Sequence, residues 1–132
     1  RGKALFVGIL NAEWSDLEGF ATEPEQREFA ALYADHMLNI FCSVDGVPVA
    51  NSGSYRCASP QFTFTAPSPW IFGPTGGVGR AVAEGYYVFL RPPTPGSHVL
   101  HFGGAVHFAI AEGDPFDFDA TIDMTYNLTV VP

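Results

Sequence analysis

The histidines His98, His101 and His107 are the first residues whose types and spacing could do chemistry. They fall within ten positions of one another, and neutral imidazole is the commonest metal ligand in proteins. If Gly103-Gly104 turns a tight hairpin, His98 and His107 become diagonal neighbours on one face. On a straight strand, His101 and His107 share a face but lie about 20 Å apart. Neither geometry brings all three histidines to one ion.

A metal site with two of these histidines would need a carboxylate, for which Glu13 and Asp123 are the candidates. Such ligand sets hold copper, zinc or non-haem iron, which predicts a small metal-dependent enzyme. In the alternative interpretation, His98 and His101 are turn and sheet residues whose rings make backbone hydrogen bonds. The spacing alone leaves both interpretations open.

Four aspartates before and along the last part of the chain are candidate calcium ligands, because calcium prefers hard oxygen ligands. The register of an EF-hand loop is absent. Alternating acidic positions are also typical of the solvated face of a strand, so a calcium site and a solvated face are the two alternatives. The four residues are Asp114, Asp117, Asp119 and Asp123.

Carboxylates around Trp14 point to carbohydrate chemistry. Glu13, Asp16 and Glu18 could supply paired carboxylates, and an aromatic ring gives a sugar a surface on which to stack. Trp70 is a second aromatic outside the predicted strands, so Glu13, Trp14 and Trp70 are the candidate ligand-binding residues. The alternative is a solvated loop that one tryptophan anchors. Nucleophile-elbow and phosphate-loop motifs are absent from the sequence.

The chain has two cysteines, Cys42 and Cys57. They bracket a predicted hairpin and could meet across it, which in an oxidising compartment means one disulfide. Closing a loop of about 15 residues would stabilise the fold by roughly 3 kcal/mol. The alternative is a pair of reduced, buried cysteines. The disulfide interpretation favours a secreted or periplasmic protein.

The elements that must position these residues are mostly short strands. Thr22 and Glu25 form a capping box, and the apolar residues that follow at helical spacing predict one helix over about residues 23–40. Asp45-Gly46 between apolar runs predicts a hairpin. Residues 67–80 are rich in proline and glycine, and we expect a loop there that buried aromatics partly pin. A second loop is predicted over residues 11–19, and further strands over residues 5–10, 62–65, 86–90, 97–102 and 105–110.

The final segment has the clearest pattern, because apolar and polar residues alternate over residues 116–130. A period of two over that length predicts a half-buried strand with one wet face. Several short strands with turn signals between them, together with one helix, predict a mainly β fold. The expected architecture is an antiparallel β-sandwich of the jelly-roll or immunoglobulin-like kind. A length of 132 residues without a linker predicts a single domain over residues 1–132.

The charge of the chain limits its partners. Six basic and 14 acidic residues give a formal net charge of −8. An anionic phosphate backbone or membrane surface would repel such a chain, so we expect no nucleic-acid partner. No apolar run is long enough to span a bilayer. A small molecule, a glycan or a second copy of the chain are the partner classes that fit.

The segment from Gly85 to Gly104 resembles part of a family of uncharacterised secreted bacterial proteins of similar size. Their segment runs G-Y-x-V-x-L-x-P-x-x-P-G-x-H-x-x-H-F-G-G, and this chain has GYYVFLRPPTPGSHVLHFGG. The opening Asn11-Ala12-Glu13 and the closing residues 125–130 are also similar to that family's ends. Family members carry a cysteine where this chain has Trp14. The resemblance implies export and a β-rich fold, and it implies no particular activity.

Three functions therefore compete. The first is an extracellular, non-catalytic binding module, with carbohydrate as one ligand class. The second is the metal-dependent enzyme with a histidine and carboxylate site. The third is a structural or assembly protein that pairs with another chain by strand addition, which would make it a homo-oligomer.

Overall fold

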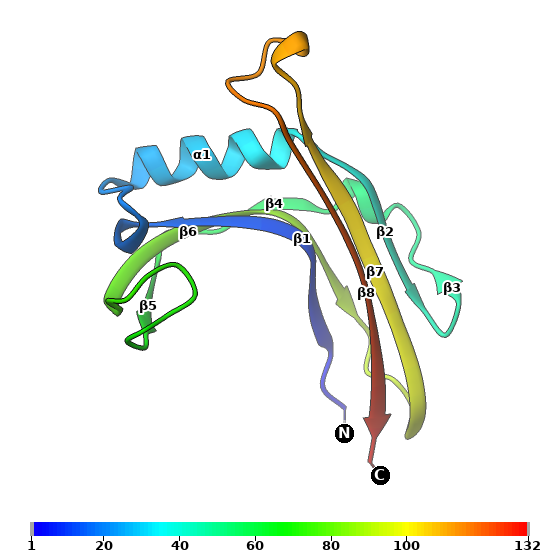
Figure 1. The fold of residues 1–132 in the computed structure, drawn as a ribbon. Helices are drawn as coiled ribbons and strands as arrows, with labels where there is room; N and C mark the ends of the chain where they lie inside the picture. The colour runs from blue at the N-terminus through cyan, green and yellow to red at the C-terminus, as the bar shows by residue number, and fades with distance from the viewer. Residues whose placement is uncertain (1, 132) are drawn as a thin grey trace. The chain divides into compact units, whose positions relative to one another are not determined.

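The computed structural model describes residues 2–131 and is mainly β, with two antiparallel four-stranded sheets and one α-helix (Figure 1). The fold class predicted from the sequence is confirmed. In these residues no helix is long and apolar enough to cross a membrane. The strands are β1 (Leu5–Ser15), β2 (Met37–Val44), β3 (Val47–Pro48), β4 (Arg56–Ala58), β5 (Phe62–Ala66), β6 (Gly77–Leu90), β7 (Gly96–Phe108) and β8 (Phe118–Val130). The helix is α1 (Glu23–Asp35), and the 3-10 turns are η1 (Asp16–Glu18), η2 (Ser52–Ser54) and η3 (Ile110–Glu112).

The first sheet has the strand order β1-β6-β4, with β5 paired to β6, and the second has the order β3-β2-β7-β8. The chain forms two compact units. Unit 1 contains Arg1–Leu10, His36–Arg56 and Tyr86–Pro132, and unit 2 contains Asn11–Asp35 and Cys57–Gly85. By these bounds, β1 and β6 each contribute residues to both units. That residues 1–132 are a single domain stays a prediction.

Unit 1 is built as an antiparallel sandwich. Its buried residues come from both sheets, because alternate side chains of each strand point to the same face and meet those of the facing sheet. Removal of this apolar surface from water is the main force that holds the two layers together. The buried cluster consists of Val7 and Ile9 from β1, Val88 from β6, Cys42 from β2, and Leu100 and Phe102 from β7.

Strand β7 runs without a break through Gly103-Gly104, so of the two geometries considered from the sequence the straight strand is the one that forms. It pairs with β8 over its whole length, and Figure 1 shows the two strands side by side. A Cβ on Gly103 would lie 1.9 Å from the carbonyl oxygen of Ile122, and one on Gly104 would lie 2.7 Å from Cδ1 of Ile40. The two glycines therefore allow close approach of neighbouring groups inside the sheet rather than a change of direction.

Helix α1 begins as predicted and ends earlier. The Thr22 N–H donates to Oε2 of Glu25 at 2.9 Å, and the Glu25 N–H donates to Oγ1 of Thr22 at 3.4 Å, so the capping box is formed. The helix ends at Asp35, and β2 begins at Met37, which pairs with Val106 of β7. The predicted extension is wrong because the β-ladder satisfies the backbone groups that a longer helix would have used.

Strand β8 follows the predicted alternation, but its apolar face is covered incompletely. It stands last in the sheet order, so among the described residues one of its edges pairs with no strand. An open edge with apolar side chains beside it is a surface on which another chain can pair. Phe118, Ile122, Met124 and Tyr126 keep between 38% and 47% of their surface exposed.

Candidate functional site

The segment predicted as a loop over residues 11–19 is mostly strand. Strand β1 continues to Ser15, and η1 follows it. Ser15 is fully buried, and its hydroxyl donates to Oε2 of Glu18 at 2.5 Å. Successive side chains of a strand point to opposite faces, so Glu13 and Trp14 serve different sides of unit 2. The strand holds Glu13 on regular backbone.

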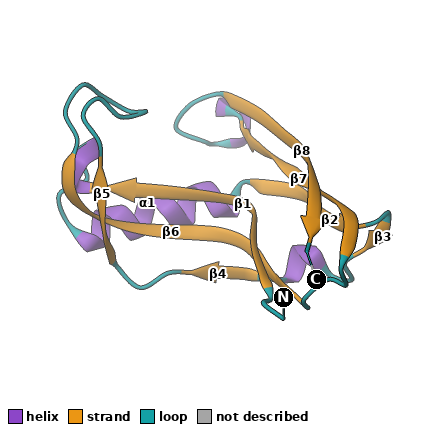
Figure 2. Ribbon diagram, turned by 90° about the horizontal axis from the view of Figure 1, so that it is seen from below, coloured by secondary structure: helices purple, strands orange, loops and turns teal. Residues whose placement is uncertain are grey.

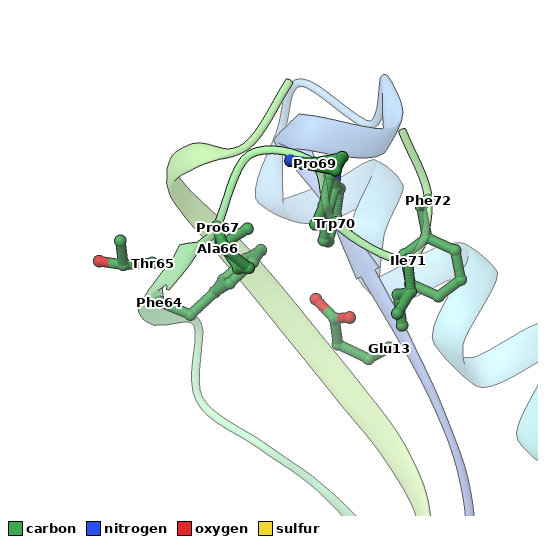
Figure 3. Close-up of a pocket in the computed structure, with 9 residues that line it drawn as sticks. All are labelled: Glu13, Phe64, Thr65, Ala66, Pro67, Pro69, Trp70, Ile71 and Phe72. Carbon is green, nitrogen blue, oxygen red and sulfur yellow. The ribbon is translucent and has the colours of Figure 1, made fainter. Parts of the chain in front are cut away.

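Glu13 lines a pocket of about 580 Å³ that lies within unit 2. Figure 3 shows its carboxyl group pointing into the space between Phe64 and Phe72, with Trp70 beside it, while the Thr65 side chain points away. Glu13 is the one charged side chain among the lining residues. These are Glu13, Phe64, Thr65, Ala66, Pro67, Pro69, Trp70, Ile71 and Phe72.

Aromatic rings form the walls of this pocket. The ring centroids of Phe64 and Trp70 are 6.0 Å apart, and those of Trp70 and Phe72 are 5.2 Å apart at an interplanar angle of 86°. Phe72 is 60% exposed and Ile71 is 85% exposed. The expectation that buried aromatics pin this loop is therefore wrong for Phe72. Concave apolar surface with one polar group aimed into it is typical of a ligand site.

The loop that carries Trp70 is closed on itself. The Trp70 N–H donates to the Gly73 carbonyl at 2.9 Å, and the Gly73 N–H donates back at 3.3 Å. The Gly76 N–H donates to Oγ of Ser68 at 2.8 Å. A Cβ on Gly76 would lie 2.0 Å from the carbonyl oxygen of Pro67, so this close approach requires glycine. The pocket wall is thus formed before any ligand arrives.

One oxygen of the Glu13 carboxyl group has no hydrogen-bond partner in the pocket. Its Oε1 atom is buried and makes no hydrogen bond among the described residues. Burial raises the pKa of Glu13, and the negative charge of Glu18 raises it further. An unpaired carboxylate in apolar surroundings destabilises the folded state. Such a group in a pocket is a candidate functional residue.

Trp14 serves the other side of the sheet. Its ring centroid lies 4.7 Å from that of Phe20, 5.7 Å from that of Phe29 and 5.3 Å from that of Tyr33. Phe29 and Tyr33 belong to α1, which lies along this face of β1 and β6 (Figure 2). Trp14 therefore anchors the helix. It is not among the residues that line the pocket, although the sequence predicted it as a ligand-binding residue.

The other two carboxylates near Trp14 are occupied by local bonds. Asp16 accepts hydrogen bonds from the Arg80 backbone N–H at 2.9 Å and from Nε of Arg80 at 3.2 Å. The backbone hydrogen bond is the main cause that lowers the pKa of Asp16. Glu18 accepts a hydrogen bond from the Ser15 hydroxyl. Of the three predicted carboxylates, Glu13 alone lines the pocket, so no pair of carboxylates flanks a bound sugar there.

The histidines of unit 1 are each paired with an aspartate. His101 and Asp123, which the sequence suggested as two ligands of one metal site, are hydrogen-bonded to each other. Within residues 2–131, however, no three histidine, cysteine, aspartate or glutamate residues are placed to hold a metal ion. The predicted transition-metal site is not formed, because each imidazole is bonded to a different carboxylate. The ring-nitrogen to carboxylate-oxygen distances are 2.8 Å for His36–Asp114, 2.7 Å for His98–Asp45, 2.8 Å for His101–Asp123 and 2.7 Å for His107–Asp119.

The predicted calcium ligands are used in the same way. Asp114 also accepts the Ala109 N–H at 2.7 Å, and Asp117 accepts the Ile110 N–H at 2.8 Å. Asp119 and Asp123 bond to histidines. These carboxylates stabilise the end of β7 and its pairing with β8, and they do not converge on one point.

His98 has the most definite protonation state. Its Nδ1 lies 2.7 Å from Oδ2 of Asp45, and its Nε2 lies 2.8 Å from the Thr94 carbonyl oxygen. A carboxylate and a carbonyl oxygen both accept, so this pair of partners favours the ring that donates from both nitrogens, which is the imidazolium. The hydrogen bond that His98 donates to Asp45 is the main cause that raises the pKa of His98, and the same bond lowers the pKa of Asp45.

The predicted disulfide between Cys42 and Cys57 is wrong, because both cysteines are free. The Asp45-Gly46 hairpin forms, with positive φ angles at both residues, but its second strand, β3, has two residues. The chain then leaves the second sheet, and Cys57 lies on β4 of the first sheet. Cys42 is buried, and Cys57 is exposed. Burial raises the pKa of the Cys42 thiol, so it behaves as a small apolar core residue.

A pocket with Glu13 and Trp70 in its lining is thus the strongest candidate site. Its other aromatic residues, Phe64 and Phe72, were missed because neither a strand pattern nor a loop pattern distinguishes a lining residue from an anchor. No family model, no curated protein and no solved structure matches this chain.

Proposed function

We propose that this chain is an extracellular, non-catalytic binding module whose small-molecule ligand occupies the pocket of unit 2. The observation that carries the proposal is the unpaired, buried Oε1 of Glu13 beside the ring of Trp70. A ligand with an apolar face and one donor group would stack on the ring and bond to the carboxyl group. A sugar has such a face and such donors. Export rests on the resemblance of residues 85–104 alone.

The lining supports binding rather than catalysis. Glycoside hydrolysis needs two carboxyl groups on either side of the bond that breaks. Glu13 is the one titratable side chain among the lining residues, and general acid–base chemistry there would have no second group.

The test uses the two tryptophans, Trp14 and Trp70. In a ¹⁵N-labelled sample each tryptophan gives one indole N–H signal. The signal that is missing in Trp70→Phe belongs to Trp70 and therefore reports on the pocket. Mono- and disaccharides, amines and small amphipathic alcohols are then titrated. We expect a saturable shift of the Trp70 signal that is lost in Phe72→Ala, which removes another ring of the lining but keeps the reporter, and is kept in Ile110→Ala, which alters an exposed apolar residue of unit 1. If only the Trp14 signal responds, the ligand site is elsewhere.

A second function, assembly by strand addition, is favoured by the open edge of β8 and by the exposed apolar residues Ile122 and Tyr126 on it. We propose that β8 pairs with β8 of a second copy. Sedimentation at increasing concentration should show dimers that Ile122→Lys abolishes, with Thr121→Lys as a control for the added charge. A strictly monomeric chain at high concentration would contradict this second function.

A further inference from the structure

The pocket combines one unpaired carboxyl group with three aromatic rings, and this combination narrows the ligand class. We propose that the pocket binds an organic cation, with an alkylated ammonium group held between the Glu13 carboxylate and the rings of Trp70 and Phe72. This inference rests on the proposed function, since it names the ligand of the same pocket.

Charge is the first argument. Nothing in the lining balances Glu13, because the remaining side chains are aromatic, aliphatic or a threonine hydroxyl. The cost of an unpaired, desolvated carboxylate is removed when an opposite charge arrives. The chain as a whole carries a net charge of −8, so its field attracts cations and repels anions.

The rings are the second argument. The π-face of tryptophan attracts a cation more strongly than that of tyrosine or phenylalanine. Trp70 and Phe72 stand nearly perpendicular to one another, with centroids 5.2 Å apart, and Phe64 lies 6.0 Å from Trp70 on the other side. Figure 3 shows the Glu13 carboxyl group between Phe64 and Phe72. Two or three rings set at an angle around a carboxylate are the surroundings that suit an alkylammonium group.

Other ligand classes fit these surroundings less well. A calcium ion needs six to eight oxygen ligands, and the pocket offers one carboxyl group. A neutral sugar needs several polar groups to fix its hydroxyls, but Thr65 points away from the space that Glu13 enters (Figure 3). An apolar ligand without charge would leave the carboxylate unpaired and more thoroughly desolvated. An organic cation satisfies the carboxylate and the rings together.

The test compares two molecules of the same shape. Choline carries a quaternary ammonium group, and 3,3-dimethylbutan-1-ol replaces its nitrogen with carbon and has no charge. Both are titrated into the full chain at neutral pH while the Trp70 indole signal is followed. Glu13→Gln removes the pocket charge, and Glu28→Gln removes one exposed charge of α1 as the matched control.

We expect choline to bind at least about tenfold more tightly than the alcohol, a ratio that lies between the strengths of an exposed and a desolvated cation–π contact. Glu13→Gln should weaken choline by a similar factor and leave the alcohol unchanged or slightly tighter, and Glu28→Gln should change neither. Equal affinity for choline and the alcohol, or equal affinity of Glu13→Gln and the unaltered chain for choline, would overturn the inference. If choline does not shift the Trp70 signal but sugars do, the organic-cation inference is wrong and the proposed binding function stands. If no compound shifts the Trp70 signal, the organic-cation inference and the proposed binding function are both contradicted.

Discussion

The carboxylates of the two units differ in how they are satisfied. All four histidines of the described chain lie in unit 1, and each has an aspartate oxygen within 2.8 Å of a ring nitrogen. Three of these histidines are on β7, and the fourth, His36, lies between α1 and β2. In unit 2 the Glu13 carboxyl group enters an apolar pocket with its Oε1 unpartnered. The histidines and aspartates that the sequence suggested as metal ligands therefore hold the fold of unit 1 together. The buried polar side-chain atoms without a hydrogen-bond partner among the described residues are Oε1 of Glu13 and Nε1 of Trp14, both on β1, and of these two residues Glu13 lines the pocket.

This difference shows why clustered histidines were a poor guide to function. A hydrogen-bonded histidine and aspartate lower the energy of the fold, and a metal would have to displace those bonds. An unpaired carboxyl group raises the energy of the folded state, so stability does not account for Glu13 in this pocket, whereas a bound ligand would.

The largest effect should come from the core of unit 1. Phe102→Ala removes a side chain that is 6% exposed, and loss of such a ring from a packed core destabilises by about 3–5 kcal/mol. Trp70→Ala should change the free energy of unfolding by about 1 kcal/mol or less, because the pocket wall is partly exposed. Chemical denaturation measures both. If Trp70→Ala costs as much as Phe102→Ala, Trp70 is a core residue and the comparison fails.

The next effect tests whether Glu13 is an exception within unit 2. Gln26 is fully buried, and its amide donates to the Phe20 and Arg80 carbonyl oxygens at 2.9 and 3.0 Å while its Oε1 accepts from Gln61. Gln26→Leu would leave these groups unsatisfied, at a cost of about 1–3 kcal/mol. The same denaturation experiment with Glu28→Gln, an exposed position of α1, should show almost no change. Equal stability of both variants would contradict this account of Gln26.

A smaller, pH-dependent effect should follow from His98. Its pKa is raised by the Asp45 hydrogen bond, so the folded chain binds this proton more tightly than the unfolded chain does. The resulting stability is complete below the unfolded-state pKa of about 6.5 and is lost as the pH rises through the higher folded-state pKa. The melting temperature of the unaltered chain should exceed that of His98→Gln most at mildly acidic pH, and the gap should narrow at higher pH. A gap that widens with pH would show that Asp45 does not hold a charged ring.

The smallest effect has the opposite sign. The raised pKa of Glu13 means that its charged form destabilises the folded chain at neutral pH. Glu13→Gln should therefore raise the melting temperature slightly at pH 7, and the gain should disappear as the pH falls below the unfolded-state pKa of about 4.3. A loss of stability at pH 7 would show that the carboxylate is structurally required.

Some of this molecule could be predicted from its residues. The Thr22 capping box, the Asp45-Gly46 turn and the alternation of β8 are local patterns with local physical causes. The box and the turn formed as predicted, whereas β8 formed as a strand whose apolar face is left largely exposed. The end of α1 and the unbroken run of β7 through Gly103-Gly104 depend on pairing with distant strands. No local pattern contains that information.

The site was predicted only in part for the same reason. Glu13 and Trp70 were singled out by residue type, and they do line one pocket. Trp14 was grouped with Glu13 because they are adjacent, but adjacent residues on a strand face opposite sides. Phe64 and Phe72 join the pocket because the loop after β5 folds back through Gly76, which is a tertiary contact.

The most direct test of the central claim is a titration of the Glu13 carboxyl carbon by ¹³C NMR, in the free chain and with saturating choline. We predict a pKa above the usual range for glutamate in the free chain and a marked fall when choline binds, because a cation favours the charged carboxylate. A Glu13 pKa within the usual range that choline does not change would show that the carboxyl group is already satisfied, and would contradict the account.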